Sequence, residues 1–177
     1  MESFKIVVGC VLAAVLYGIV HDQFTARICL EYFTVFHPPV FQTQSPTLLG
    51  FGWGVIATWW VGVLLGVPVA ITSRIGSHQK LRLRDLTRPI AVLLIVMAGC
   101  AVISGIVGYI WGQIPQEIAT SLPANLHRRF EADLWAHSAS YLCGFLGGIS
   151  LCIVTYRERV RLSRTVREMA DAESRTS

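Results

Sequence analysis

Histidine and carboxylate side chains gather in two short segments of this 177-residue chain. One segment covers residues 21–37 and the other covers residues 127–137, and each borders a long apolar stretch. Imidazole and carboxylate groups are the ligands that zinc, iron, manganese and copper commonly take from proteins. We therefore predict a divalent metal site, with these candidate ligands: His21, Asp22, Glu31, His37, His127, Glu131, Asp133 and His137.

The spacing of these residues predicts which of them share a helix face. Residues four apart lie on one side of a helix, so Asp133 is expected beside His137 at the start of an apolar stretch. His21 and Asp22 follow the end of another such stretch. Ionisable groups at a membrane boundary are costly to bury and are candidates for function. A metal ion held there with an open position would support hydrolysis or oxidation of a lipid-soluble substrate.

Other interpretations fit the same residues. The histidines and carboxylates can pair with one another and cap helix ends, which requires no bound ion. Alternatively, haem can use two histidines as axial ligands, or the surrounding aromatic residues can form a pocket for a quinone or another lipid. The chain contains no H-E-x-x-H, E-x-x-H or C-x-x-C-H motif, so none of the corresponding site types is indicated.

The rest of the chain indicates the elements that position these residues. Apolar residues make up 53% and charged residues 15%, whereas soluble domains have about 25% charged residues. Because a lipid-exposed backbone must bond within its own segment, apolar stretches of about 20 residues predict membrane helices. We therefore expect an all-α integral membrane four-helix bundle forming one domain over 1–177, with spans at about 4–20, 47–72, 89–111 and 134–156.

Lysine and arginine side chains are distributed unevenly along the chain. Twelve lie in the N-terminal stub, in loop 73–88 and in tail 157–177, against three in loops 21–46 and 112–133. Cytoplasmic segments carry the excess of basic residues, so both termini are expected in the cytoplasm and those two loops outside.

Loop 73–88 is expected to be a solvated turn that includes His78. We expect four tail arginines to lie against anionic headgroups: Arg157, Arg159, Arg161 and Arg164.

No A-x-A cleavage site follows the first apolar stretch, so we expect this stretch to remain as a span rather than to be removed as a signal peptide.

Three of the stretches contain a G-x-x-x-G pair. Such pairs let helices approach closely, either within one chain or across a homo-oligomer. They also favour a second hypothesis, a structural or accessory subunit of a larger membrane complex. Lipids are the expected partners, and the net charge of +4 does not indicate nucleic acid, because the basic residues flank spans.

One segment of the chain has a recognisable pattern, HDQFTAR followed by EYF and HP, between His21 and Pro38. It resembles a segment of small, uncharacterised multi-span membrane proteins of bacteria. The resemblance covers about twenty residues and implies a bacterial inner membrane location. It implies no activity and no ligand.

Overall fold

The computed structural model describes residues 1–176, so the last residue of the expected tail, Ser177, lies outside the described residues. Within that range the chain is all-helical and forms no strand. The helices are α1 (Glu2–Ile28), α2 (Leu30–Thr34), α3 (Pro46–Ile56), α4 (Trp59–Arg74), α5 (Leu83–Trp111), α6 (Gln116–Ala119), the 3₁₀ helix η1 (Ala124–Leu126) and α7 (His127–Thr176).

Four segments are long and apolar enough to cross a membrane, as the sequence predicts. They are α1, the pair α3 and α4, α5, and α7, so the chain is built as a membrane protein. All four spans differ from the prediction. Helix α1 continues to Ile28 because no proline or glycine follows Gly18 there, and the second span is interrupted at residues 57–58. Helix α5 begins at Leu83, before the predicted start at 89, and α7 extends on both sides of 134–156.

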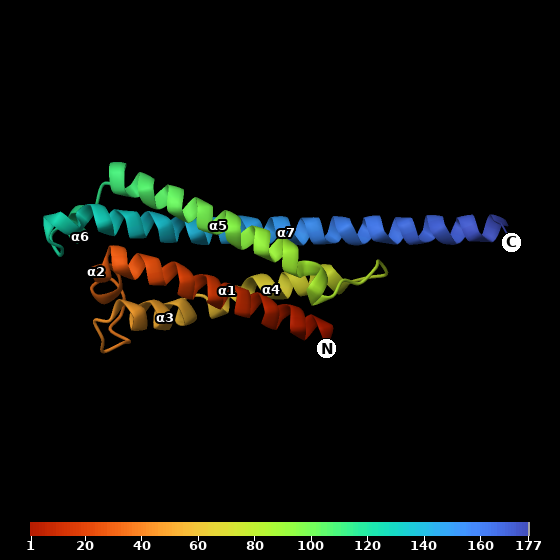
Figure 1. Cartoon of the computed structure of the whole chain (residues 1–177), viewed down its shortest axis with the longest axis horizontal. Helices are drawn as coiled ribbons and strands as arrows, with labels where there is room; N and C mark the ends of the chain where they lie inside the picture. The colour runs from red at the N-terminus through yellow and green to blue at the C-terminus, as the bar shows by residue number, and fades with distance from the viewer. Residues whose placement is uncertain (177) are drawn as a thin grey trace.

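The long helices form two layers (Figure 1). Helix α5 packs on α7, and α1 packs on α3 and α4, while contacts between the two layers are fewer. Glycines bring α1 close to its partners, because a Cβ atom on Gly54 would lie 2.5 Å from Ile19 Cα and one on Gly62 would lie 2.6 Å from Val11 Cα. Gly108 approaches the α7 backbone in the same way. Gly62 and Gly108, which belong to two of the predicted glycine pairs, therefore serve close packing within one chain.

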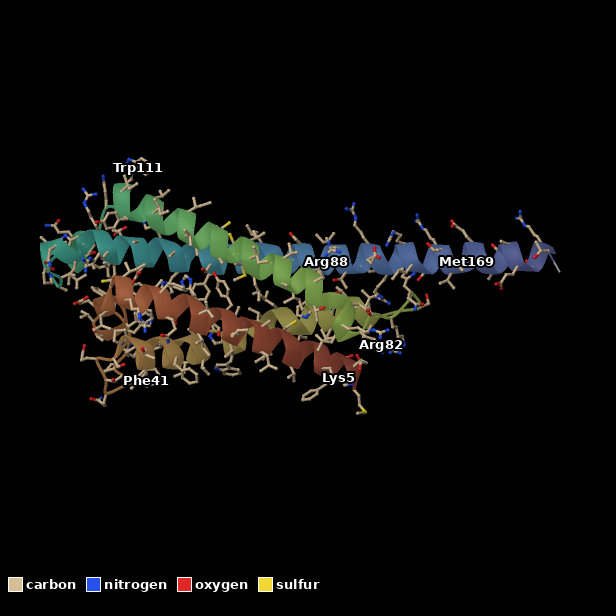
Figure 2. All side chains as sticks on the ribbon, viewed as in Figure 1. Lys5, Phe41, Arg82, Arg88, Trp111 and Met169 are labelled. Atoms are coloured by element: carbon tan, nitrogen blue, oxygen red, sulfur yellow. The ribbon has the colours of Figure 1, made fainter. Side chains whose placement is uncertain are left out.

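The two ends of the molecule differ in composition. Figure 2 shows Lys5 and Arg82 at one end, where the N-terminus and the loop between α4 and α5 also lie. We call this the basic end. Phe41 and Trp111 lie at the opposite end, which carries the loops 29–45 and 112–126. We call this the histidine end, since the candidate ligands in 21–37 and 127–137 lie there.

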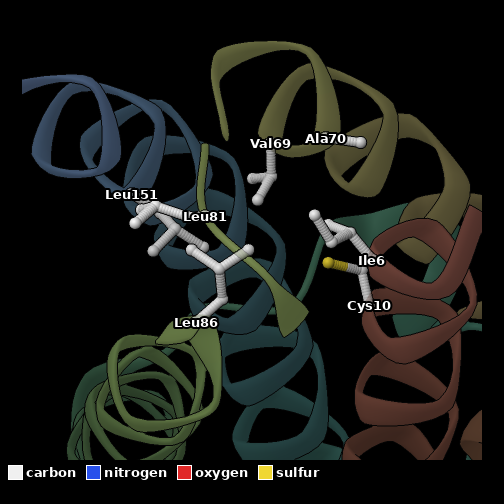
Figure 3. Close-up of a cluster of buried hydrophobic side chains, with 7 residues drawn as sticks. All are labelled: Ile6, Cys10, Val69, Ala70, Leu81, Leu86 and Leu151. Carbon is white, nitrogen blue, oxygen red and sulfur yellow. The ribbon is translucent and has the colours of Figure 1, made fainter. Parts of the chain in front are cut away.

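An apolar cluster closes the basic end (Figure 3). It brings together side chains from both layers and from the loop before α5. Its buried members are Ile6, Cys10, Val69, Ala70, Leu81, Leu86 and Leu151. This cluster fixes the two layers to each other at the end opposite the candidate ligands.

Arg159 lies beside this cluster rather than against lipid headgroups. Its side chain is completely buried. The guanidinium donates hydrogen bonds to four backbone carbonyls, those of Thr72 (2.6 Å), Ile75 (2.7 Å), Gln79 (2.8 Å) and His78 (3.1 Å). The expectation of headgroup contact is wrong for Arg159, because the end of α4 and the following loop offer it unpaired carbonyl oxygens.

His78 also differs from the expectation of a solvated side chain. Its Nδ1 is buried without a hydrogen-bond partner among residues 1–176. The ring packs edge-on against Tyr156, with 5.9 Å between the ring centroids. The His78 ring therefore packs on α7, while its neighbours at 75–77 and 79–80 are exposed.

Candidate metal centre

Three of the candidate ligands meet between the two layers at the histidine end. His21 and Asp22 come from the last part of α1, and His137 comes from α7. One ligand atom from each residue lies within 4.8 Å of the other two. The nearest pair is His137 Nε2 and Asp22 Oδ1, 3.2 Å apart. Two imidazoles and one carboxylate therefore converge on a common point.

A backbone contact determines the orientation of the His137 ring. Its Nδ1 lies 2.7 Å from the backbone oxygen of Asp133. A carbonyl oxygen can only accept, so Nδ1 carries the hydrogen and, in the neutral ring, Nε2 presents a lone pair to Asp22. A lone pair facing a carboxylate requires a proton or a cation between them. This orientation by a backbone acceptor is the arrangement that metal-binding histidines commonly have.

His21 contributes a polar atom without a partner. Its Nε2 is buried and makes no hydrogen bond to any residue that the structure describes. The ring packs edge-on against that of His137, with centroids 4.6 Å apart, and stacks on Tyr17 at 5.7 Å. Buried polar atoms are nearly always paired in native proteins, so an unpaired imidazole nitrogen at this position points to a ligand.

Asp133 is a second buried carboxyl group near this site, one helical turn before His137. It is completely buried, and neither of its carboxylate oxygens has a hydrogen-bond partner within residues 1–176. Neither Asp22 nor Asp133 forms an ion pair with a lysine or arginine in the described chain. The charge of these carboxyl groups is therefore balanced by protons or by a bound cation.

His37 lies in the loop that follows α2, next to the three converging residues. It lines the same cavity as they do, and its ring is stacked on Phe33 (5.5 Å) and edge-on to Trp53 (4.5 Å). Burial lowers the pKa of His37, an effect that the hydrogen bond between Nδ1 and the Tyr32 carbonyl (2.8 Å) opposes in part. The lowered pKa favours the neutral ring near pH 7, but His37 lies outside the group formed by His21, Asp22 and His137.

Three other predicted ligands have different partners. His127 Nε2 lies 3.0 Å from the Leu122 carbonyl, and Glu131 accepts a hydrogen bond from Trp135 Nε1 at 2.9 Å beside the end of α5. Glu31 accepts a hydrogen bond of 3.7 Å from Cys29 Sγ. These residues, and Asp133, lie outside the group formed by His21, Asp22 and His137.

A cavity extends from the converging residues into the space between the layers. The space inside it that water-sized molecules can occupy is about 160 Å³. Near the polar end, Tyr17 and Ser140 form a hydrogen bond of 2.8 Å that joins α1 to α7. Neither residue is among the predicted ligands, although Ser140 follows His137 by three residues and so shares its helix face.

No protein-family model, no curated protein and no solved structure matches this chain.

Proposed function

We propose that the protein binds a divalent metal ion at the histidine end through His21, Asp22 and His137. The observation that carries the proposal is the convergence of their three donor atoms within 4.8 Å, from helices of different layers. The unpaired Nε2 of His21 and the orientation of His137 support it. The structural alternative is a proton shared between Asp22 and His137, which leaves the His21 nitrogen without a partner.

The spacing of the donor atoms is close to what an ion requires. Ligand atoms bound at about 2.1 Å from zinc lie at most about 4.2 Å apart. The pair His137 Nε2 and Asp22 Oδ1, at 3.2 Å, already meets this limit. All three donor atoms lie within 4.8 Å of one another, so small side-chain rotations are needed for the group to meet this limit throughout.

Two imidazoles and one carboxylate leave coordination positions open for water or a substrate. Zinc would lower the pKa of a bound water to about 7, and ferrous iron would support oxidation. Manganese and copper are compatible with the same donors. We propose metal-assisted hydrolysis or oxidation of a lipid-soluble substrate, because the adjacent cavity is mainly apolar.

We place the four spans in a bacterial inner membrane as a four-helix bundle, with both termini in the cytoplasm and the histidine end outside. The concentration of lysine and arginine at the basic end supports this orientation. The bound ion would then face the periplasm.

Elemental analysis of the purified full-length protein tests the metal site. After loading with zinc, iron, manganese or copper, about one ion per chain is expected in the wild type and none in the double variant His21→Ala/His137→Ala. The matched control is His127→Ala, because His127 bonds to the Leu122 carbonyl and lies outside the group. Absence of metal from the loaded wild type, or its retention by the double variant, refutes the proposal.

A second candidate function is that of an accessory subunit. Helix α7 extends well beyond the other helices (Figure 1), and its residues 164–176 are exposed. Such an arm can contact a partner protein. Copurification of a stoichiometric partner that is lost when residues 165–177 are removed would support this function.

A further inference from the structure

We infer that the cavity between the layers binds a lipid with a flat, uncharged, hydrogen-bonding ring and one long apolar chain, the chemistry of a prenylated quinone. The inference goes beyond the proposed metal site, since it concerns the cavity that extends from that site between the layers. The contents of the cavity wall, rather than its size alone, indicate this ligand.

The length and lining of the cavity suit one apolar chain. The cavity is lined by α7 from His137 to Leu151, a rise of about 21 Å, whereas half of a bilayer core is about 15 Å. Small residues on three helices are among those that line it: Ala13, Ala14, Gly62, Gly144 and Gly148. Below the histidine end the wall carries apolar side chains, cysteine and the hydroxyls of Thr58, Tyr17, Ser140 and Tyr141.

The upper part of the cavity suits a flat ring. Tyr32 is stacked on His137 with centroids 4.6 Å apart and 26° between the planes, and Phe33 is stacked on His37 at 17°. Such aromatic faces stack favourably on a planar head group. His21 Nε2 and Asp22 lie among these rings and offer hydrogen bonds to a quinone carbonyl or a quinol hydroxyl.

The charges at the cavity exclude the more abundant lipids. No lysine or arginine of the described chain lines it, and the one carboxylate in the wall is that of Asp22. In the metal-free protein, a phosphate or fatty-acid head group would therefore be buried without a lysine or arginine partner, which costs free energy. An uncharged ring that accepts and donates hydrogen bonds meets no such penalty.

Binding of a quinone with a two-unit prenyl chain to the full-length protein in detergent tests the inference. Trp53 lines the cavity, so quenching of tryptophan fluorescence reports occupancy, and native mass spectrometry reports stoichiometry. Ala14→Phe fills the cavity and is expected to weaken binding about tenfold or more. Ala91→Phe is the matched control, because Ala91 is exposed on α5 and does not line the cavity.

A second variant keeps the test valid if Ala14→Phe fails to fold. Gly144→Val narrows the cavity from α7, where an added Cβ would first meet the flexible Met97 side chain at 3.2 Å. The inference is overturned if both variants bind the quinone like the wild type. It is also overturned if oleate or a phospholipid competes with the quinone at equal or higher affinity.

Metal content measured on the same samples separates this inference from the metal proposal. A protein that binds the quinone but no metal supports the cavity ligand and refutes only the metal site. A protein that binds metal but no quinone refutes the cavity ligand alone. Loss of quinone binding in Ala14→Phe with normal metal content shows that the fold is intact and supports the inference.

Discussion

The His37 imidazole illustrates how a single side chain is adapted to its position. The ring lies between Phe33 and Trp53 in a loop outside the spans, and this burial lowers the pKa of His37. The hydrogen bond from Nδ1 to the Tyr32 carbonyl holds the ring in one tautomer. His37 is thus kept neutral and oriented beside the three converging ligands.

This pKa shift predicts a loss of stability in mild acid. An unfolded chain has a histidine pKa of about 6.5, so as the pH falls the unfolded state binds the proton before the folded state does. The contribution of neutral His37 is complete above that pH and declines below it. His37→Gln is expected to reduce the fall in melting temperature between about pH 7.5 and about pH 5.5. An unchanged fall would show that His37 does not titrate in this way.

At the scale of the elements, packing of α1 on α3 depends on Gly54. A Cβ atom there would lie 2.5 Å from both N and Cα of Ile19, which are backbone atoms and cannot move aside independently. Gly54→Ala is therefore expected to lower the free energy of unfolding by about 2 kcal/mol. Thermal unfolding in detergent measures this change.

The control for Gly54 is Gly99→Ala in α5. No heavy atom lies within 4 Å of the added Cβ, apart from its own helix backbone and chain neighbours. Alanine favours helix over glycine, so stability is expected to stay constant or rise by less than about 1 kcal/mol. Equal losses in the two variants would contradict the packing argument.

A second link between elements is the Arg159 side chain, which joins α7 to the end of α4. Arg159→Ala removes a buried guanidinium that donates to the carbonyl oxygens of Thr72 and Ile75, and a loss of about 3 kcal/mol is expected. Arg157→Ala removes an exposed guanidinium two residues earlier and is expected to change stability by less than about 0.5 kcal/mol. Chemical unfolding of the two variants distinguishes them, and equal effects would refute the role of Arg159.

At the scale of the whole molecule, the separation of a basic end from a histidine end predicts the orientation in the membrane. A fluorescent protein fused after the tail is expected to fluoresce in the cytoplasm, and alkaline phosphatase inserted at Gln44 is expected to be active outside. Replacing Lys80, Arg82 and Arg84 by glutamine weakens the charge difference and should produce a mixture of orientations. Phosphatase activity from a fusion after the tail would contradict the assignment.

The sequence by itself determined that the chain is helical and where its four apolar segments lie. Hydropathy is a local property, and each helix in lipid must satisfy its backbone hydrogen bonds internally. The clustering of histidines and carboxylates in 21–37 and 127–137 was equally visible in the sequence.

Only the tertiary structure decided which of these side chains meet. His137 and Asp22 meet although they are 115 positions apart in the chain. His127 instead bonds to the Leu122 carbonyl, and Glu131 accepts a hydrogen bond from Trp135. The rotation of each helix about its axis depends on contacts with other helices, such as that of Gly54 with Ile19, and not on its own periodicity. The burial of Arg159 had the same origin, since the carbonyls it binds belong to another helix and its loop.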